Sequence, residues 1–487
     1  MRKARLTIAD KKTNLADDTV DFYSACVSPG TSRIITQLAL ERGALQHTID
    51  VGGAYYKGTP KAPEDGGRLV YARVPAYLHR YGDYPTHGPD GTPNLLLIVG
   101  NMPGRRDAGR IWEIEYDKFL LHNRGMTQCV YDTRVFHWRN PDDDDEFLLA
   151  HIHVDDTHLT ATSMPVLKAF VDAWCLEFDE DADDCATLSE DFAGVRYQRV
   201  DSSTCVLTCV GAIDNLVAIL AAHPLNDCIK TDVPLSSESL RVLNAPPDVG
   251  NPLVLDMLPS ARRTVGIVSF ISSVRPDVQL AFKVLSRCVN ERRLTAYAWR
   301  EIRRMAAYLT GTRHLGLTLR RSNGQLTAYV DSSLANGPEG RSWGGYALRF
   351  ETTGLASGCF DVKCSLPNTV TEATGASELH QAIRVTKSVM GFRILLKELG
   401  FAPAGPTLVN TDARVLIDGT RGRKVSTESK WMSVRYAMAR HAEEVEAIHL
   451  KKCPTELNFS DIVTKPLTGQ LFRRHRAAVL GLPVADS

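Results

Sequence analysis

The sequence predicts a chain of the α+β class, in which β-hairpins, a helical stretch and an α/β region follow one another. Apolar runs of strand length lie on both sides of His153-Val154-Asp155-Asp156, a pattern typical of a β-hairpin. Between residues 262 and 308, apolar side chains recur instead at helical spacing. After the turn signal Ser322-Asn323-Gly324, strand-like and helix-like runs alternate. At about 150 residues per domain, a chain of 487 residues predicts roughly three domains.

Composition gives few clues to a partner, because 57 basic and 57 acidic side chains leave a net charge of zero. Eleven cysteines are scattered without repeated Cys-x-x-Cys pairs, which favours reduced thiols over a disulfide scaffold or a zinc finger. No apolar run approaches the roughly 20 residues of a membrane span, and the N-terminus lacks the apolar core of a signal peptide. We therefore expect an intracellular, soluble protein.

Charge is nevertheless uneven along the chain. In residues 262–321, thirteen Lys or Arg side chains stand against three acids, a local charge of +10. A basic tract of this length is a candidate surface for binding phosphate groups. The alternative is an ordinary solvated helix face, and charge alone does not decide between the two.

The adjacent carboxylates Asp155 and Asp156 mark the first candidate site. Like charges at the turn of a hairpin repel each other unless a cation lies beside them, and Mg²⁺ prefers carboxylate oxygen. Asp50 ends another strand-like run, residues 45–49. Together the three acids could hold two metal ions about 3.5–4 Å apart for nucleotidyl transfer. Each acid taken alone could equally be a turn or cap residue.

Four acids in the last third of the chain form a second candidate set. Asp331 follows the strand-like run 326–330, and Glu378 lies in a predicted helix over residues 373–399. Asp412 follows a third strand-like run, and Asp461 precedes Ile462 near the C-terminus. If these acids converge, they could bind two Mg²⁺ ions for phosphodiester hydrolysis. Their spacing in the sequence does not show convergence, and each could be a cap or a surface group.

Histidines near the first motif allow another interpretation. His151 and His153 alternate along one strand, and His158 follows the turn. With Asp155 they could form a zinc site, because imidazole nitrogen and carboxylate oxygen are common zinc ligands. The alternative is a strand with polar residues on one side.

The order of these motifs resembles the reverse transcriptase and RNase H part of a copia-type retrotransposon Pol polyprotein, over about residues 3–482. Residues 49–58 are similar to the family's DVKTAFLNG, and residues 153–156 to its YVDD. Residues 460–467 are similar to ADILTKPL, which is a specific signature. Further segments resemble the motifs KARL (residues 3–6), YRSLVGSL (263–266), TRPDI (274–278), YLKGT (308–312), YSDAD (329–332), the segment with the RNase H glutamate (376–379) and CDN (410–412).

This resemblance implies a fold and an activity. The expected fold is a right-hand polymerase with fingers and palm at residues 1–245 and a helical thumb or connection at 246–322, followed by an α/β RNase H-like domain at 323–487. The implied activities are RNA-directed DNA polymerase and ribonuclease H, with two Mg²⁺ ions in each active site. The implied partners are an RNA template, a DNA primer, an RNA–DNA hybrid and dNTPs, in a cytoplasmic particle or in the nucleus. The implied catalytic and metal-binding residues are Asp50, Asp155 and Asp156 for the polymerase and Asp331, Glu378, Asp412 and Asp461 for the ribonuclease.

The sequence also departs from the family's pattern. Asp107 stands where the family has a nucleotide-contacting glutamine, and a carboxylate there would repel a triphosphate. His153 replaces a tyrosine, and Gly52-Gly53 replace Lys-Thr. Trp431 stands where the family usually has histidine. These departures leave a second hypothesis open, a catalytically silent relic that keeps the fold and at most binds nucleic acid.

Overall fold

The computed structural model describes residue 7 and residues 22–65, 67–75, 85–181, 190–223, 232–245, 250–352, 355–422 and 432–483. The chain forms two compact units: residues 1–27 with 45–189, and residues 28–44 with 190–487. These limits do not coincide with the three domain ranges expected from the sequence, which stay a prediction. The KARL-like segment and Trp431 lie outside the described residues.

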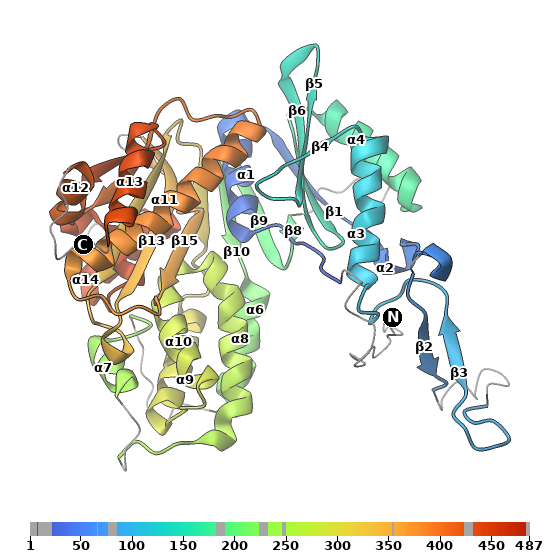
Figure 1. The fold of residues 1–487 in the computed structure, drawn as a ribbon, viewed down its shortest axis with the longest axis horizontal. Helices are drawn as coiled ribbons and strands as arrows, with labels where there is room; N and C mark the ends of the chain where they lie inside the picture. Colours follow the sequence, from blue (N-terminus) through green and yellow to red (C-terminus); the bar gives the residue numbers. More distant parts are fainter. Residues whose placement is uncertain are drawn as a thin grey trace. The chain divides into compact units, whose positions relative to one another are not determined.

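The first unit is built on an antiparallel sheet with strand order β1-β7-β6-β5-β4 (Figure 1). The predicted hairpin is confirmed: β6 and β7 pair from Leu148 opposite Ala161 to His153 opposite Asp156. β1 lies on the other side of β7, so Asp50 stands opposite Asp156. The strands are β1 (Leu45–Asp50), β4 (Thr127–Gln128), β5 (Val135–Asn140), β6 (Asp143–His153) and β7 (Asp156–Ala161).

Two helices cover this sheet through aromatic side chains at helical spacing. In α3 (Ala108–Lys118), Trp112 and Tyr116 lie one turn apart, and the chain continues into a short π-helix, η4 (Phe119–Asn123). In α4 (Met164–Phe178), Phe170 and Phe178 lie on the same face. The rings of Trp112 and Phe178 pack edge to face at 5.4 Å, and both belong to one buried cluster with the sheet. The unit also contains α2 (Ala54–Lys57), η2 (Pro63–Asp65) and a two-stranded sheet of β2 (Val70–Arg73) and β3 (Leu95–Ile98).

The second unit begins with a helix that the sequence analysis did not predict, α1 (Pro29–Arg42). The Ser28 side chain accepts a hydrogen bond from the backbone N–H of Thr31, Pro29 occupies the first helical position, and Gly43 closes the helix with a φ of 67°. Residues 30–40 are all buried. The helix packs against strands β10 (Thr204–Thr208), β11 (Leu317–Arg320) and β15 (Asp361–Ser365).

A helical bundle fills the middle of this unit, and apolar spacing predicted its helices between residues 262 and 308 but not α6. Helices α6 (Val210–Ala222), α8 (Leu258–Val274), α9 (Gln279–Asn290) and α10 (Ala296–Gly311) pack against one another (Figure 1). In the predicted stripe, Leu285 and Val289 of α9 are almost fully buried, and Phe282 is half-buried. The helix α7 (Ser237–Asn244) packs against α9 and α10. A four-stranded sheet, with order β11-β10-β9-β8, includes β8 (Asp191–Phe192) and β9 (Val195–Asp201).

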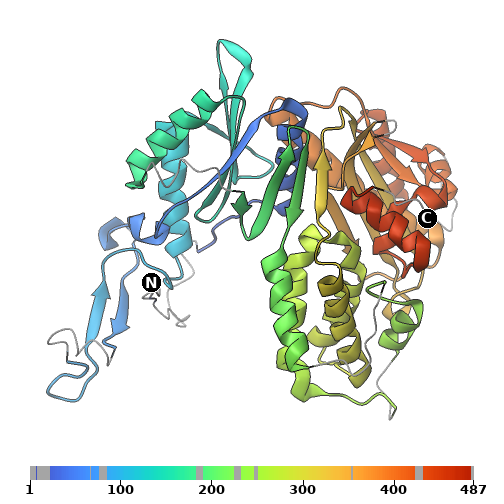
Figure 2. The same ribbon diagram turned by 180° about the vertical axis from the view of Figure 1, so that it is seen from behind.

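The C-terminal part of the second unit is a mixed six-stranded sheet with helices on both faces. Strands β12, β13 and β15 are antiparallel, whereas β12, β16 and β17 run parallel. Helix α11 (Thr374–Glu398) crosses one face in Figure 1, and α14 (Gly469–Leu480) lies over the other face in Figure 2. The remaining elements are β12 (Gln325–Ser333), β13 (Trp343–Thr352), β14 (Leu355–Ala356), β16 (Thr407–Thr411), β17 (Ile448–Lys452), α12 (Arg414–Arg421), α13 (Ser433–Glu444) and η10 (Phe459–Val463).

The fold is therefore a mixed α and β architecture, in agreement with the predicted class. In the described part of the chain, every helix is too short or too polar to cross a membrane.

A buried ion pair explains why the TRPDI-like segment lies in the bundle. Arg275 donates to both carboxylate oxygens of Asp277 at 2.9 and 2.7 Å, and both side chains are fully buried. Tyr308 of α10 donates to the same carboxylate at 2.6 Å, and Arg476 of α14 donates to the Tyr308 hydroxyl at 3.2 Å. A buried charge needs such partners, so this network joins three helical elements.

Candidate active sites: two groups of carboxylates

Three of the four predicted C-terminal acids converge at one place. Asp331 lies on β12 and Asp412 directly follows β16, each two residues beyond the parallel pair Tyr329 and Asn410. Glu378 reaches the same place from the second turn of α11. One carboxylate oxygen from each of Asp331, Glu378 and Asp412 lies within 4.8 Å of the others. Asp331 and Glu378 are buried, and Asp412 is half-buried.

The fourth acid, Asp461, joins this group through a lysine. The Nζ of Lys465 lies 3.2 Å from Oδ1 of Asp331 and 3.0 Å from Oδ1 of Asp461. The hydroxyl of Thr464 donates to Oδ2 of Asp331. We call Asp331, Glu378, Asp412 and Asp461, with Lys465, the C-terminal acid cluster.

Burial and mutual repulsion set the protonation of this cluster. Burial, followed by the charges of Asp331 and Asp412, raises the pKa of Glu378 to about 9. Burial and the charge of Asp331 raise the pKa of Asp461 to about 8. Burial also raises the pKa of Asp331, against the opposing effect of Lys465. Burial alone would lower the pKa of Lys465, but the Asp331 and Asp461 carboxylates raise it above its ordinary value.

These donors fit a hard divalent cation such as Mg²⁺. Oε2 of Glu378 is buried and lacks a hydrogen-bond partner among the described residues. Three carboxylates crowd the same small space, and a divalent cation would neutralise the repulsion that raises their pKa values.

Asparagine and threonine side chains that the sequence analysis did not single out support the cluster. Asn458 is fully buried and donates to the carbonyl of Val330 at 3.0 Å and to Oδ1 of Asp412 at 3.4 Å. Thr464 and Lys465 belong to the ADILTKPL-like segment, so the motif was the available signal for them. Nothing in the sequence pattern indicated Asn458.

The three N-terminal acids lie together on neighbouring strands, with a looser spacing. Asp50 and Asp156 stand opposite each other at one end of β1 and β7, and Asp155 lies in the adjacent turn. Asp50 is exposed, and the other two are half-buried. In the described ranges, the C-terminal group is the one set of three metal-binding side chains within 4.8 Å, so these acids do not reach that spacing.

A tryptophan fixes the turn that carries Asp155. Val154 adopts a φ of 62°, which is strained for a β-branched residue. The indole N–H of Trp112 donates to the carbonyl of Val154 at 2.8 Å. The hydroxyl groups of Tyr116 and Thr157 lie 2.6 Å apart. Helix α3 therefore holds the hairpin through side chains that the sequence analysis did not assign.

The carboxylate of Asp107 forms an ion pair with Arg105, a residue of the same motif. Arg105 donates to both of its oxygens, at 3.0 and 2.9 Å, and both side chains are buried. The repulsion of a triphosphate that the sequence predicts for a lone carboxylate is therefore offset by a neighbouring guanidinium.

Two of the three histidines near the first motif form part of the sheet core, and His153 is half-buried. His151 and His158 are buried with ring centroids 4.9 Å apart. Burial lowers the pKa of His158 to about 3 and that of His151 well below its usual value. Both ring nitrogens of His158 have hydrogen-bonding partners, Thr48 at 2.9 Å and Gln46 at 3.0 Å. Among the described residues, neither histidine belongs to a set of three metal-binding side chains whose ligand atoms lie within 4.8 Å of one another. This favours the structural interpretation over zinc.

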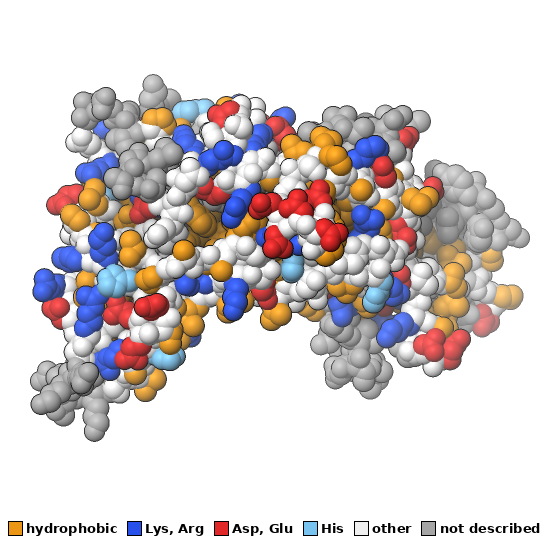
Figure 3. Space-filling model, turned by 90° about the horizontal axis from the view of Figure 1, so that it is seen from above, with side chains coloured by type: hydrophobic (Ala, Val, Ile, Leu, Met, Phe, Trp, Pro, Cys, Tyr) orange, Lys and Arg blue, Asp and Glu red, His pale blue; other side chains and the backbone are white. Residues whose placement is uncertain are grey.

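The basic tract divides into structural and exposed side chains. Arg275 forms the buried pair described above, and Arg304 pairs with the buried Glu301 at 3.3 Å. Arg262 and Arg263 are exposed on α8 and keep the phosphate-binding interpretation open. On the face shown in Figure 3, basic and acidic side chains lie among one another, in line with the zero net charge.

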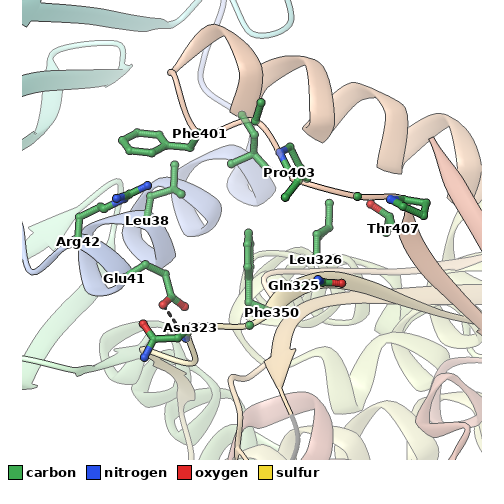
Figure 4. A pocket seen from close by; sticks show the side chains of 16 residues that line it. Leu38, Glu41, Arg42, Asn323, Gln325, Leu326, Phe350, Phe401, Pro403 and Thr407 are labelled. Atoms are coloured by element: carbon green, nitrogen blue, oxygen red, sulfur yellow. Dashed lines mark hydrogen bonds between the residues drawn. The ribbon is translucent and has the colours of Figure 1, made fainter. Parts of the chain in front are cut away.

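A cavity of about 340 Å³ in the second unit lies away from the acids (Figure 4). Leu326, Phe350, Phe401 and other mainly apolar residues line it, and Thr407 at its edge begins β16. Asp412 follows the other end of β16, roughly 16 Å along the strand. The Glu41 carboxylate in its wall is held by backbone N–H groups of residues 322 and 323. This cavity therefore lacks the free carboxylates of a catalytic site.

Comparisons with known proteins support the resemblance seen in the sequence. No protein-family model matches the chain. The chain is 21% identical over 476 residues to "Retrovirus-related Pol polyprotein from transposon RE2" of Arabidopsis thaliana, which covers 97% of this chain and 30% of that protein. It is 21% identical to the corresponding polyprotein from transposon RE1 of the same plant over 484 residues, 98% of the chain and 30% of that protein. It is 20% identical to that from transposon TNT 1-94 of Nicotiana tabacum over 469 residues, 95% of the chain and 33% of that protein.

The homologues of the chain are thus transposon Pol polyproteins, which confirms the resemblance to the copia-type retrotransposon family. The chain spans about a third of the length of these curated relatives. Among solved structures, a foamy viral protease-reverse transcriptase in complex with RNA/DNA hybrid matches 86% of this chain and 45% of that chain, at 11% identity and a TM-score of 0.43. LC11-RNase H1 isolated from compost matches 29% of this chain and 93% of that chain, at 16% identity and a TM-score of 0.23. Likenesses with TM-scores of this size do not define a fold.

Proposed function

We propose that this chain cuts the RNA strand of RNA–DNA hybrids at the C-terminal acid cluster and extends a DNA primer on an RNA template at Asp50, Asp155 and Asp156. The observation that carries the proposal is the convergence of Asp331, Glu378 and Asp412, from three separate elements, to within 4.8 Å. The transposon Pol homologues over nearly the whole chain support it. The proposed partners are RNA template, DNA primer, hybrid and dNTPs.

The hydrolytic site would hold its cations through Asp331, Glu378, Asp412 and Asp461. Two bound Mg²⁺ ions would supply a nucleophilic hydroxide at neutral pH and stabilise charge on the scissile phosphate. In the metal-free chain, Glu378 holds a proton at neutral pH, because its pKa is about 9. Thr464 and Lys465 orient Asp331 by contacting both of its oxygens.

The polymerase site would use the hairpin of the first unit. Asp50, Asp155 and Asp156 would hold Mg²⁺, which supplies activation of a primer hydroxyl and charge stabilisation on the triphosphate. Trp112 holds the Asp155 turn through the carbonyl of Val154. We propose fingers and palm for residues 1–245, thumb or connection for 246–322 and an RNase H-like domain for 323–487, in a cytoplasmic particle or in the nucleus.

Two assays on the purified chain test both activities. An RNA–DNA hybrid with labelled RNA and a primed RNA template with dNTPs are each incubated with Mg²⁺. Asp331→Asn should lose hybrid cleavage and retain extension, whereas Asp155→Asn should do the reverse. Asp418→Asn is the matched control, because this exposed acid on α12 forms an ion pair with Arg414 and lies in the same unit as the cluster. Cleavage by Asp331→Asn at the rate of the unaltered chain would overturn the hydrolytic assignment.

The departures from the family motifs favour one second candidate, a catalytically silent relic. His153 replaces the tyrosine of YVDD, and the N-terminal acids do not reach the spacing of the C-terminal group. The same assays decide between the two. A chain that binds hybrid without cutting or extending it is a relic, whereas either activity excludes that interpretation.

A further inference from the structure

Lys465 occupies the space between two of the four acids in the C-terminal cluster. Its Nζ lies 3.2 Å from Asp331 and 3.0 Å from Asp461. Its backbone N–H donates to the carbonyl of Asp461 at 2.8 Å, so the lysine is held one turn after Asp461, just beyond the end of η10. The side chain is about one-third exposed, whereas those of Asp331 and Asp461 are 1% and 5% exposed. This ammonium is therefore a positioned neighbour of both carboxylates.

The donors around the cluster divide it into two halves. On one side, Lys465 and Thr464 contact the two oxygens of Asp331. On the other side, Oε2 of Glu378 has no hydrogen-bond partner in the described part of the chain, and Asp412 accepts one long bond, of 3.4 Å, from Asn458. One half thus already contains a cation, and the other half presents carboxylate oxygen without one.

A divalent cation between Asp331 and Asp461 would lie beside the ammonium and be repelled by it. The repulsion is strong here, because buried charges are screened less than charges in water. A cation held by Glu378 and Asp412, with Asp331 as a shared ligand, would instead lie on the side where, among the described residues, no ammonium contacts the Glu378 or Asp412 carboxylate. The two halves therefore differ in their capacity for metal.

We propose that Lys465 is a built-in counter-ion that limits the cluster to one divalent cation for as long as its ammonium lies between Asp331 and Asp461. The second cation enters the gap between Asp331 and Asp461 only when the ammonium leaves it. This inference rests on the proposed function in one respect, that these acids bind metal. It adds a positioning residue that determines when the second ion is admitted.

Titration of the full-length chain with Mn²⁺, followed by calorimetry and by the electron paramagnetic resonance of free Mn²⁺, tests the inference. All proteins carry Asp50→Asn and Asp155→Asn, so that the ions counted belong to the C-terminal cluster. With Lys465 intact, we expect one bound ion. Lys465→Met should bind two ions, and it should bind the first at least tenfold more tightly than the parent does. Lys465→Arg keeps the positive charge, so it should bind one ion.

Lys452→Met is the matched control. This ammonium is close to the cluster but donates to the backbone carbonyl of Asp412, not to a carboxylate. Its loss removes the same charge, and the count should stay at one. If Lys465→Met unfolds, as judged by circular dichroism, Lys465→Gln replaces it, because the amide can still donate to the carboxylates without a charge.

The inference is overturned if the Lys465 variants bind one ion with the affinity of the parent, or if Lys452→Met also binds two. Hybrid cleavage, measured separately on chains with and without Lys465, keeps this result distinct from the proposed function. A change in ion count without any cleavage supports the counter-ion role and rejects the hydrolytic activity. Cleavage by the parent with an unchanged ion count rejects the counter-ion role alone.

Discussion

The two groups of acids differ in how the repulsion between their like charges is reduced. The C-terminal acids come from β12, α11, the end of β16 and η10, and they are mostly buried. The N-terminal acids lie on adjacent strands and the turn beside them, and they are exposed or half-buried. Burial removes the water that would screen the charges, so the C-terminal group needs protons and Lys465 as partners. The N-terminal group keeps more of its surface in contact with solvent.

This difference teaches that convergence has a cost in stability. The C-terminal acids are held together before any metal arrives, and the metal-free chain holds extra protons as a result. The N-terminal acids remain farther apart, and their placement depends on a strained turn held by Trp112. The first group is pre-organised at the expense of stability, and the second is more exposed but less closely assembled.

The largest expected effect separates activity from stability at Glu378. Glu378→Gln resembles the protonated acid, so hybrid cleavage should fall on the order of 10²–10³-fold, as for the loss of other charge-stabilising groups. Because the pKa of about 9 obliges the folded chain to take up a proton, the metal-free variant should be more stable at pH 7 by about 1–3 kcal/mol. Cleavage assays and urea unfolding with a chelator measure both.

Asp155→Asn is the comparison for this prediction. Its acid is half-buried at a turn, so the free energy of unfolding should change by less than about 0.5 kcal/mol. If Glu378→Gln and Asp155→Asn raised the free energy of unfolding by the same amount, this would contradict the proposed difference between the two groups of acids.

A smaller effect concerns the response of the first unit to acid. His158 has a pKa of about 3 when folded, against 6.5 ordinarily, so the unfolded chain binds the proton between these values. The contribution of neutral His158 to the free energy of unfolding is fully present above pH 6.5 and is lost as the pH falls toward 3. From pH 7 to pH 5 the chain should lose about 2 kcal/mol on this account. His158→Gln should remove that part of the loss in urea unfolding followed by tryptophan fluorescence.

The control for this prediction is His87→Gln, because His87 is exposed in the same unit. Its substitution should leave the acid response unchanged. An identical response of the unaltered chain and His158→Gln would show that the buried histidine is not the cause.

The smallest effect concerns the support of the hairpin turn. Trp112→Phe keeps an aromatic ring in the core but removes the hydrogen bond to Val154. Primer extension should fall on the order of tenfold, as is typical of groups that position metal ligands, while hybrid cleavage stays unchanged. Trp138→Phe, a half-buried tryptophan of β5 in the same unit, should leave both rates as they are. A loss of cleavage equal to the loss of extension would indicate general unfolding instead of a local role.

Much of the secondary structure followed from local patterns. The hairpin of β6 and β7, the helices around the stripe of α9 and the strand before Asp412 were all predicted from apolar periodicity. Helix α1 was not predicted, although Ser28, Pro29 and Gly43 are typical helix boundary residues. Its buried, mixed composition lacks a clear polar face, so periodicity gave no signal for it.

The sequence by itself determined which side chains are available: seven acids in an order that resembles the copia-type family, and a basic tract between them. Tertiary structure decided what those side chains do. It brought Asp331, Glu378 and Asp412 together, placed Lys465 beside Asp331, and paired Asp107 with Arg105. The physical reason is that strand register brings together residues that are far apart in the chain. Burial then excludes water from their side chains, as it does from the neighbouring Arg105 and Asp107, and so decides which charges must pair. Local sequence carries residue type and periodicity, whereas the strength of a charge depends on what surrounds it.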